Sequence, residues 1–378
     1  MKFFSAFGQS TNLEKAIEQA VYPLNEAYDI GFLFCSGLYP DVHLASQYLK
    51  KHLHVNTVIG CTCTGLVTKK QEIAGDVAGV SLLLGQAAKG NFQSHHIIPE
   101  ELKSLSNKEA IYDMLDIFPH EHPSFILLAD PYTFDAGSFI SLLANAYPGE
   151  EIIGGLASGR TESRSDYVFH NDQAYDKGAT LLTIRNVKMQ TRVTHGCLPL
   201  GDPFFITDAK QNVIKKLAGK DPWPLLNELV EETTPELRLL SKHGVFAGLA
   251  DNEKQAESSN YLIRSVMAAD PETGRIAVGG PVQTGQLVQF HVRSGRKSAE
   301  DLVSLCKGLP DSKAILSFNC NGRAEHGSPT NNDDAKLIHK TLPGVALSGF
   351  QCAGEIGPLL DQPALHTFTN CMAFFSED

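Results

Sequence analysis

An internal repeat constrains the fold of this chain more than any other feature of its sequence. Residues 32–65 read as a short apolar strand, an amphipathic helix and a second apolar strand, and residues 126–159 read the same way. A looser third copy occupies residues 314–357 and has a longer loop after its first strand. Four landmarks of the first copy recur 94 residues later in the second: Phe32 and Ile126, Asp41 and Asp135, Gly60 and Gly154, Gly65 and Gly159.

Each copy carries the local signals of a capped helix that packs on a sheet. An aspartate precedes each helix, and we expect its carboxylate to accept hydrogen bonds from the free amides of the first turn. These aspartates are Asp41, Asp135 and Asp333. A further apolar run follows each copy, at 79–85, 178–184 and 370–375. Short strands that alternate with helices of about ten residues indicate an α/β arrangement.

Residues 191–311 depart from the repeat and are rich in hairpin signals. Turn residues occupy 270–274 between two strand-like runs, and Pro222 opens a helical segment. The predicted fold class is therefore α/β, with repeated β-α-β(-β) units that form mixed sheets covered by helices and a hairpin-rich insert. Two regions are predicted, residues 1–190 and 191–378. Two polar segments are expected to be surface loops: 160–166 and 251–260.

The composition excludes several classes of protein. Of 378 residues, 42% are hydrophobic and 20% are charged, as in packed globular proteins. The formal net charge is −11 and no basic run occurs, so neither nucleic acid nor an anionic membrane is an expected partner. No signal peptide or membrane span is evident. The eight cysteines are spread from Cys35 to Cys371, which favours reduced thiols and a cytoplasmic protein.

The turns that follow the repeated strands hold most of the candidate binding residues. In α/β sheets, ligands bind beyond the carboxyl ends of the strands. Small residues there let a backbone approach a ligand, although single glycines in turns are most often structural. The candidates in these turns are Cys61, Thr62, Thr64, Asp130, Ser158, Cys320, Asn321, Cys352 and Gly354.

Two charged residues flank the turns of the third copy. Arg323 offers a planar fork for a carboxylate or phosphate, and Glu355 can bind an amine. Together they would satisfy a zwitterion such as an amino acid. The alternative is a salt bridge between the two residues that holds the strand ends together.

The cysteines and histidines leave further alternatives open. Cysteines in the turns are most often small buried hydrophobes, and the C-T-C spacing of Cys61 and Cys63 does not match structural zinc sites. Cys320 would be a nucleophile if Arg323 lowered its pKa. His195 lies two residues from Cys197 and is a candidate haem or metal ligand.

Several motifs resemble the FIST-domain proteins. The resemblance to the FIST N region rests on the segments VIGCTCTG, LLADPYTF and IIGGLASG. The resemblance to the FIST C region rests on SFNCNGR and on GFQCAGEIGP followed by His366. The likeness covers roughly residues 30 to 375. It implies a bacterial sensory module that binds small ligands, with amino acids the usual suggestion. Some relatives look like haem-binding nitric oxide sensors, but the GEIGP and CNGR forms depart from that subgroup.

Three functional hypotheses follow. The first is a cytoplasmic sensor for a small polar metabolite, without a cofactor, that signals through a partner protein because no output domain accompanies the two regions. The second is a haem-binding nitric oxide sensor that uses His195. The third is a thiol-dependent enzyme that uses Cys320, and we expect an enzyme less than a sensor.

Overall fold

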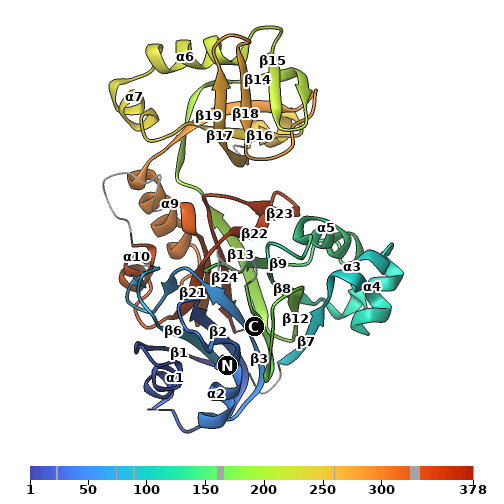
Figure 1. The fold of residues 1–378 in the computed structure, drawn as a ribbon, viewed down its shortest axis with the longest axis vertical. Coiled ribbons are helices and arrows are strands. Elements are labelled where there is room, and N and C mark those ends of the chain that lie inside the picture. Colours follow the sequence, from blue (N-terminus) through green and yellow to red (C-terminus); the bar gives the residue numbers. More distant parts are fainter. Residues whose placement is uncertain are drawn as a thin grey trace.

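The computed structural model describes residues 1–22, 24–73, 75–87, 90–159, 166–258, 260–323 and 333–377. These residues form three six-stranded mixed sheets and one closed six-stranded barrel. Figure 1 shows the three sheets together in the lower part of the molecule and the barrel above them. The predicted fold class, mixed sheets covered by helices with an inserted hairpin-rich segment, is confirmed.

Three units of similar plan make up the sheets. The first unit contains β1 (Lys2–Gly8), α1 (Leu13–Val21), β2 (Tyr28–Ser36), η1 (Val42–Leu44), α2 (Ala45–His52), β3 (Val55–Cys63), β4 (Leu66–Val67), β5 (Glu72–Ile73) and β6 (Val80–Gln86). The second contains β7 (Asn91–Ile97), α3 (Pro99–Ser104), α4 (Lys108–Leu115), η2 (Pro119–Glu121), β8 (Ser124–Ala129), α5 (Ala136–Ala146), β9 (Ile152–Leu156), β10 (Val168–His170), β11 (Gln173–Tyr175) and β12 (Ala179–Arg185).

The third unit follows the same order but is interrupted after its first strand. It contains β13 (Lys188–Thr194), α9 (Gly295–Lys307), β20 (Ala314–Cys320), η3 (Asn321–Arg323), α10 (Asp334–Thr341), β21 (Ala346–Cys352), β22 (Gly354–Leu359), β23 (Gln362–His366) and β24 (Asn370–Ser376). The predicted boundary between residues 190 and 191 falls inside β13, and the division into two regions stays a prediction.

Each unit contributes a hairpin to the sheet of another unit, in a cyclic order. The β4–β5 hairpin of the first unit pairs with β21 of the third, and β10–β11 of the second pairs with β3 of the first. The β22–β23 hairpin of the third unit pairs with β9 of the second. Each sheet therefore takes its outer two strands on one side from another unit, so the three units are interlocked.

Three glycines fix the equivalent register in the three sheets. A Cβ on any of them would lie within 2 Å of a carbonyl oxygen on the neighbouring parallel strand. The pairs are Gly60 with Leu33, Gly154 with Leu127, and Gly349 with Ser317. Only glycine allows this close approach. The positions define which residues of the three units correspond.

The sheets bury two kinds of core. Their inner faces meet in one shared core, where Phe34 stacks on Phe350 with ring centroids 4.9 Å apart and Leu128 joins from the second unit. Each outer face packs against its own helices, α1 and α2, α4 and α5, or α9 and α10.

The inserted barrel has its own core. It contains β14 (Cys197–Lys210), β15 (Val213–Leu217), α6 (Pro222–Glu232), α7 (Pro235–Ser241), β16 (Phe246–Ala250), α8 (Glu253–Glu257), β17 (Leu262–Asp270), β18 (Arg275–Val278) and β19 (Leu287–Arg293). The chain enters by β14 and leaves by β19, and Cys197 pairs with Arg293 across these strands. We call this paired strand end the stem of the barrel.

Some local predictions are confirmed and others are wrong. Asp135 and Asp333 cap their helices through their carboxylates. Asp41 does not, because a 3₁₀ turn precedes α2 and its carboxylate instead accepts from Tyr48. The loop predicted over 251–260 contains α8, which Asn252 caps. Within the loop predicted over 160–166, Asp166 is buried, and residues 160–165 lie outside the described residues.

Among the described helices, none has both the length and the apolar character needed to cross a membrane.

Candidate functional site

The third unit carries buried polar residues where the other two carry apolar ones. Three equivalent positions in each unit lie on the face of the sheet that the helices cover, next to the register glycines Gly60, Gly154 and Gly349. They hold Ser317, Asn319 and Asn370 in the third unit, Leu33, Cys35 and Val80 in the first, and Leu127, Ala129 and Ala179 in the second. All nine residues are buried. The fold itself therefore does not require the polar set.

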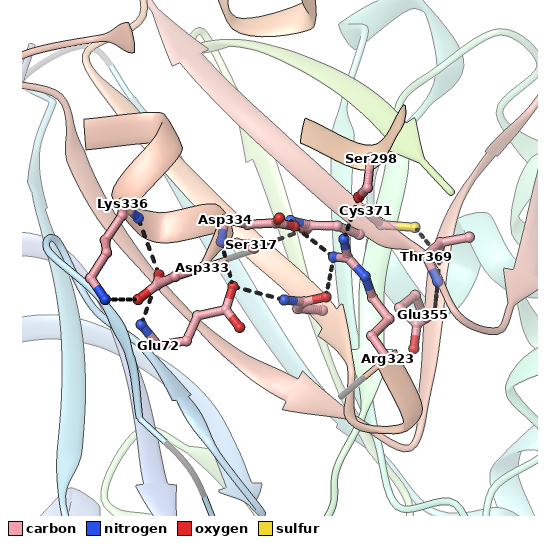
Figure 2. Close-up of polar contacts among 12 residues, drawn as sticks. Glu72, Ser298, Ser317, Arg323, Asp333, Asp334, Lys336, Glu355, Thr369 and Cys371 are labelled. Carbon is pink, nitrogen blue, oxygen red and sulfur yellow. Dashed lines mark hydrogen bonds and ion pairs between the residues drawn. The ribbon is translucent and has the colours of Figure 1, made fainter. Parts of the chain in front are cut away.

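Arg323 lies in the middle of this polar set (Figure 2). Its Nη1 donates to Asp334 Oδ2 at 2.6 Å and to Asn319 Oδ1, and its Nη2 donates to Ser298 Oγ at 2.9 Å. The side chains of Arg323 and Asp334 are 9% and 2% exposed. This buried ion pair joins η3 to the first residue of α10, and Ser298 ties both to α9.

Side chains of the sheet strands complete the hydrogen bonding of Asp334. Asn370 Nδ2 donates to Asp334 Oδ2 at 2.8 Å, and Ser317 Oγ donates to Asn370 Oδ1 at 2.9 Å. The other carboxylate oxygen, Asp334 Oδ1, is buried and has no hydrogen-bond partner among the described residues. An acceptor of this kind is costly unless something donates to it.

Glu72 reaches this network from the hairpin of the first unit. Its Oε1 accepts from Asn319 Nδ2 at 3.0 Å and from the backbone amide of Asp334 at 3.1 Å. Burial, with the charge of Asp334 as a further cause, raises the pKa of Glu72 to about 8. The hairpin exchange therefore brings a carboxyl group from one unit into the polar core of another.

Glu355 is a second buried carboxyl group in β22. Its Oε2 accepts from the backbone amide of Thr369 at 3.1 Å and from Thr369 Oγ1 at 2.8 Å, and the Cys320 thiol is a further hydrogen-bond neighbour of the carboxyl group. Burial raises its pKa to about 8. Burial and the neighbouring Glu355 also raise the pKa of the Cys320 thiol to about 12.

Arg293 closes the site from the barrel side. It is the last residue of β19, it is 9% exposed, and no described residue hydrogen-bonds to its Nη1. Burial, followed by the charge of Arg323, lowers its pKa to about 10. No pattern in the sequence marks Arg293 as a site residue.

The pairing considered for Arg323 and Glu355 is not the one that forms. Arg323 forms its ion pair with Asp334, and Glu355 binds Thr369. Both still lie in one neighbourhood, because the charge of Arg323 acts on the pKa of Glu355 and Figure 2 shows the two side by side. Asn321 lies beside them in η3, and Gly354 opens β22 before Glu355.

The other predicted residues meet at a different place. Ser158 Oγ donates to the carbonyl of Gln351 at 2.5 Å and accepts from the amide of Thr64 at 3.0 Å. Thr62 Oγ1 donates to Asp166, whose amide in turn donates to Asp130. These contacts join turns of the three units to one another.

The predicted thiols are buried. Burial raises the pKa of both Cys61 and Cys352 well above the ordinary value for a thiol. This agrees with the interpretation of these cysteines as small buried side chains.

His195 is buried at the stem. Its Nδ1 accepts from the amide of Cys197 at 3.1 Å, and burial lowers its pKa. The further charges that act on its pKa come from Asp301, Lys297 and Arg293. In the described part of the chain, no group of three or more His, Cys, Asp or Glu side chains could hold a metal ion. Haem binding stays a prediction.

Comparison of the repeats would have found part of the site from sequence. When the three copies are aligned on Gly60, Gly154 and Gly349, Ser317 and Asn319 align with apolar residues of the other two copies. By contrast, Glu72 and Arg293 come from outside the third copy, and no local pattern marks them.

The chain is similar to two family models and to several known proteins. The FIST N domain model matches residues 29–220 and the FIST C domain model matches residues 224–358. An uncharacterized protein of Mycobacterium bovis is 31% identical over 328 residues, covering 85% of this chain and 83% of that protein. One from Mycobacterium tuberculosis is 30% identical over 325 residues, covering 84% and 83%. A solved structure of cyanuric acid hydrolase from A. caulinodans aligns with 7% identity and a TM-score of 0.31, over 100% of this chain and 99% of that one.

Proposed function

The chain belongs to the FIST family, whose domains are sensor domains of signal transduction, and from this premise we propose that it senses a small polar metabolite. The metabolite is an amino acid or a similar acid in the cytoplasm. It binds at the polar set of the third unit, and a partner protein receives the signal.

The polar set of the third unit carries this proposal. Burying amides, hydroxyls and charges costs free energy unless each is paired. The first and second units build the same sheet with leucine, valine, alanine and cysteine at the matching positions. A unit that keeps Ser317, Asn319 and Asn370 there gives up apolar packing, which a binding function explains.

One unpaired atom indicates what the ligand supplies. Asp334 Oδ1 is a buried acceptor that no donor among the described residues reaches. A ligand that brings N–H or O–H donors, such as an ammonium group, would satisfy it. Arg323 then acts as a positioning residue, because Asp334, Asn319 and Ser298 already occupy its guanidinium.

The two alternative functions gain no support from the geometry. A thiol with a pKa of about 12 is almost wholly protonated at pH 7, which weighs against Cys320 as a nucleophile. The surroundings of His195 add nothing in favour of haem.

A thermal-shift screen of amino acids and related acids tests the proposal. We expect at least one compound to raise the melting temperature of the wild-type chain. Asn370→Val copies the matching Val80 of the first unit, and we expect it to fold and to lose this response. Thr133→Val removes a hydroxyl that donates to Asp130 in the second unit, and it should keep the response. The proposal would be contradicted if no compound raised the melting temperature of the wild-type chain, or if Asn370→Val kept the full increase.

A further inference from the structure

We propose that Arg293 binds an anionic group of the ligand that carries a single negative charge, such as a carboxylate, at the stem between the barrel and the third unit. The inference rests on the proposed function for the place of the site. It adds which residue receives the anionic group, what charge that group carries, and which two parts of the molecule the ligand joins.

Arg293 is buried, and no described residue forms an ion pair with it. Its side chain takes part in no hydrogen bond or salt bridge between described residues, and Nη1 is buried without a partner. A guanidinium offers five donors in a fixed plane, and leaving such donors unpaired inside a protein is unfavourable. Arg293 is therefore prepared for an acceptor that comes from outside the chain.

A half-buried arginine and a buried one show what a structural arginine looks like in this protein. Arg264 donates to the carbonyl oxygens of Leu365 at 2.9 Å and Ile263 at 3.3 Å. Arg323 is paired with Asp334. Both hold neighbouring strands or helices in place, and Arg293 has no comparable contact among the described residues.

The charges around Arg293 favour a single negative charge on the ligand. The charge of Arg323 acts on the pKa of Arg293, and Asp334 neutralises Arg323 through its ion pair. Burial raises the pKa of Glu72 and of Glu355, which favours their neutral forms. Among the described residues Arg293 therefore keeps a positive charge that no carboxylate pairs, and one singly charged anionic group balances it.

The place of Arg293 links binding to the barrel. Arg293 ends β19 opposite Cys197 of β14, and the next residue, Ser294, caps α9. The amide of Ser294 donates to the carbonyl of Gly196 at 3.0 Å, which holds the two chains of the stem together. A ligand that contacts Arg293 on one side and the third unit on the other joins the barrel to the sheets at this point (Figure 1).

Sodium acetate is the simplest probe of this site. The full-length chain is titrated with acetate at pH 7 and constant ionic strength, with sodium chloride as the balancing salt, and the melting temperature is recorded. We expect a saturable rise for wild type, no saturable rise for Arg293→Gln, and a weakened rise for Arg293→Lys, which keeps the charge but not the planar fork. Arg296→Gln, which removes an exposed arginine paired with Glu236 at the start of α9, should behave as wild type.

Two further measurements keep the proposal testable if acetate binds weakly. Without added carboxylate, Arg293→Gln should melt roughly 1–3 °C above wild type, because it removes a buried charge that has no partner. Inorganic phosphate, largely a dianion above pH 7, should stabilise wild type less than acetate does at equal concentration. An acetate response that survives Arg293→Gln, a lower melting temperature for Arg293→Gln, or a stronger response to phosphate would overturn the proposal.

The outcomes separate this inference from the proposed function. A metabolite from the screen that binds Arg293→Gln as well as wild type leaves the sensor proposal standing and removes Arg293 from it. If Arg293→Gln abolishes the acetate response, but no metabolite raises the melting temperature of wild type, the anion site is supported and the sensor proposal is contradicted.

Discussion

At the scale of single residues, the ion pair between Arg323 and Asp334 holds the candidate site together. Removing one member of a buried pair leaves a charge without compensation. We expect Asp334→Ala to lower the free energy of unfolding by about 3–5 kcal/mol, as measured by urea denaturation. Asp301→Ala breaks the more exposed pair with Lys297 on α9 and should cost at most about 0.5 kcal/mol. Equal losses for the two variants would show that the buried pair has no special importance.

The carboxyl group of Glu355 should make stability depend on pH. Its pKa is about 8 in the folded chain and near 4.5 when unfolded, so the folded state binds the proton more tightly between these values. Stability from this group is therefore complete below pH 4.5 and is lost as the pH rises through 8. Glu72 acts in the same direction.

Glu355→Gln tests this pH dependence. We expect its urea midpoint to fall less steeply than that of wild type between pH 5 and pH 8, with a residual slope from Glu72. Glu377→Gln, which removes an exposed carboxyl group bound to the amino terminus, should keep the wild-type slope in this range. Parallel curves for Glu355→Gln and wild type would contradict the assignment.

At the scale of elements, the three register glycines are equivalent, and their substitution should be equally damaging. A methyl group at Gly60, Gly154 or Gly349 would lie within 2 Å of a carbonyl oxygen on the neighbouring strand. We expect each alanine variant to lose about 3 kcal/mol or more of stability, or to fail to fold. Gly137→Ala in the first turn of α5 meets only Asp135, at 3.6 Å, and should be neutral or stabilising. A register glycine that tolerates alanine would remove the equivalence of the units at that position.

The sequence predicts the elements far better than their pairing. Strand, helix and strand in each copy, and the caps Asp135 and Asp333, follow from patterns within about 30 residues. The hairpin exchange does not, because β4 and β5 are only two residues long each and β4 pairs with a strand more than 270 residues away. Helix α8 was missed because its residues are polar, although Asn252 is a recognisable cap.

Contacts between distant segments also limit how much of the candidate site can be predicted from the sequence. Arg323 and Glu355 stand out because they are charged residues beside turns of small residues. Arg293 ends an ordinary apolar strand, LVQFHVR, and its importance comes from the partners that it lacks in the folded chain. A missing contact between distant segments leaves no mark on local sequence.

At the scale of the whole molecule, the exchange of hairpins predicts that no unit folds alone. A fragment of residues 1–87 lacks β10 and β11, which complete its sheet, and its own hairpin loses its place beside β21. We expect this fragment to show no cooperative thermal transition by circular dichroism, whereas the full chain shows one. A cooperative transition of the fragment would mean that the units are independent.

The barrel and the three sheets meet at the stem, so the central claim concerns what binds there. The most direct measurement is a crystal structure of the full chain with the strongest compound from the metabolite screen. We expect an acidic group of that compound on Arg293 Nη1 and a donor group on Asp334 Oδ1. A compound ordered elsewhere, with neither atom contacted, would contradict the proposal.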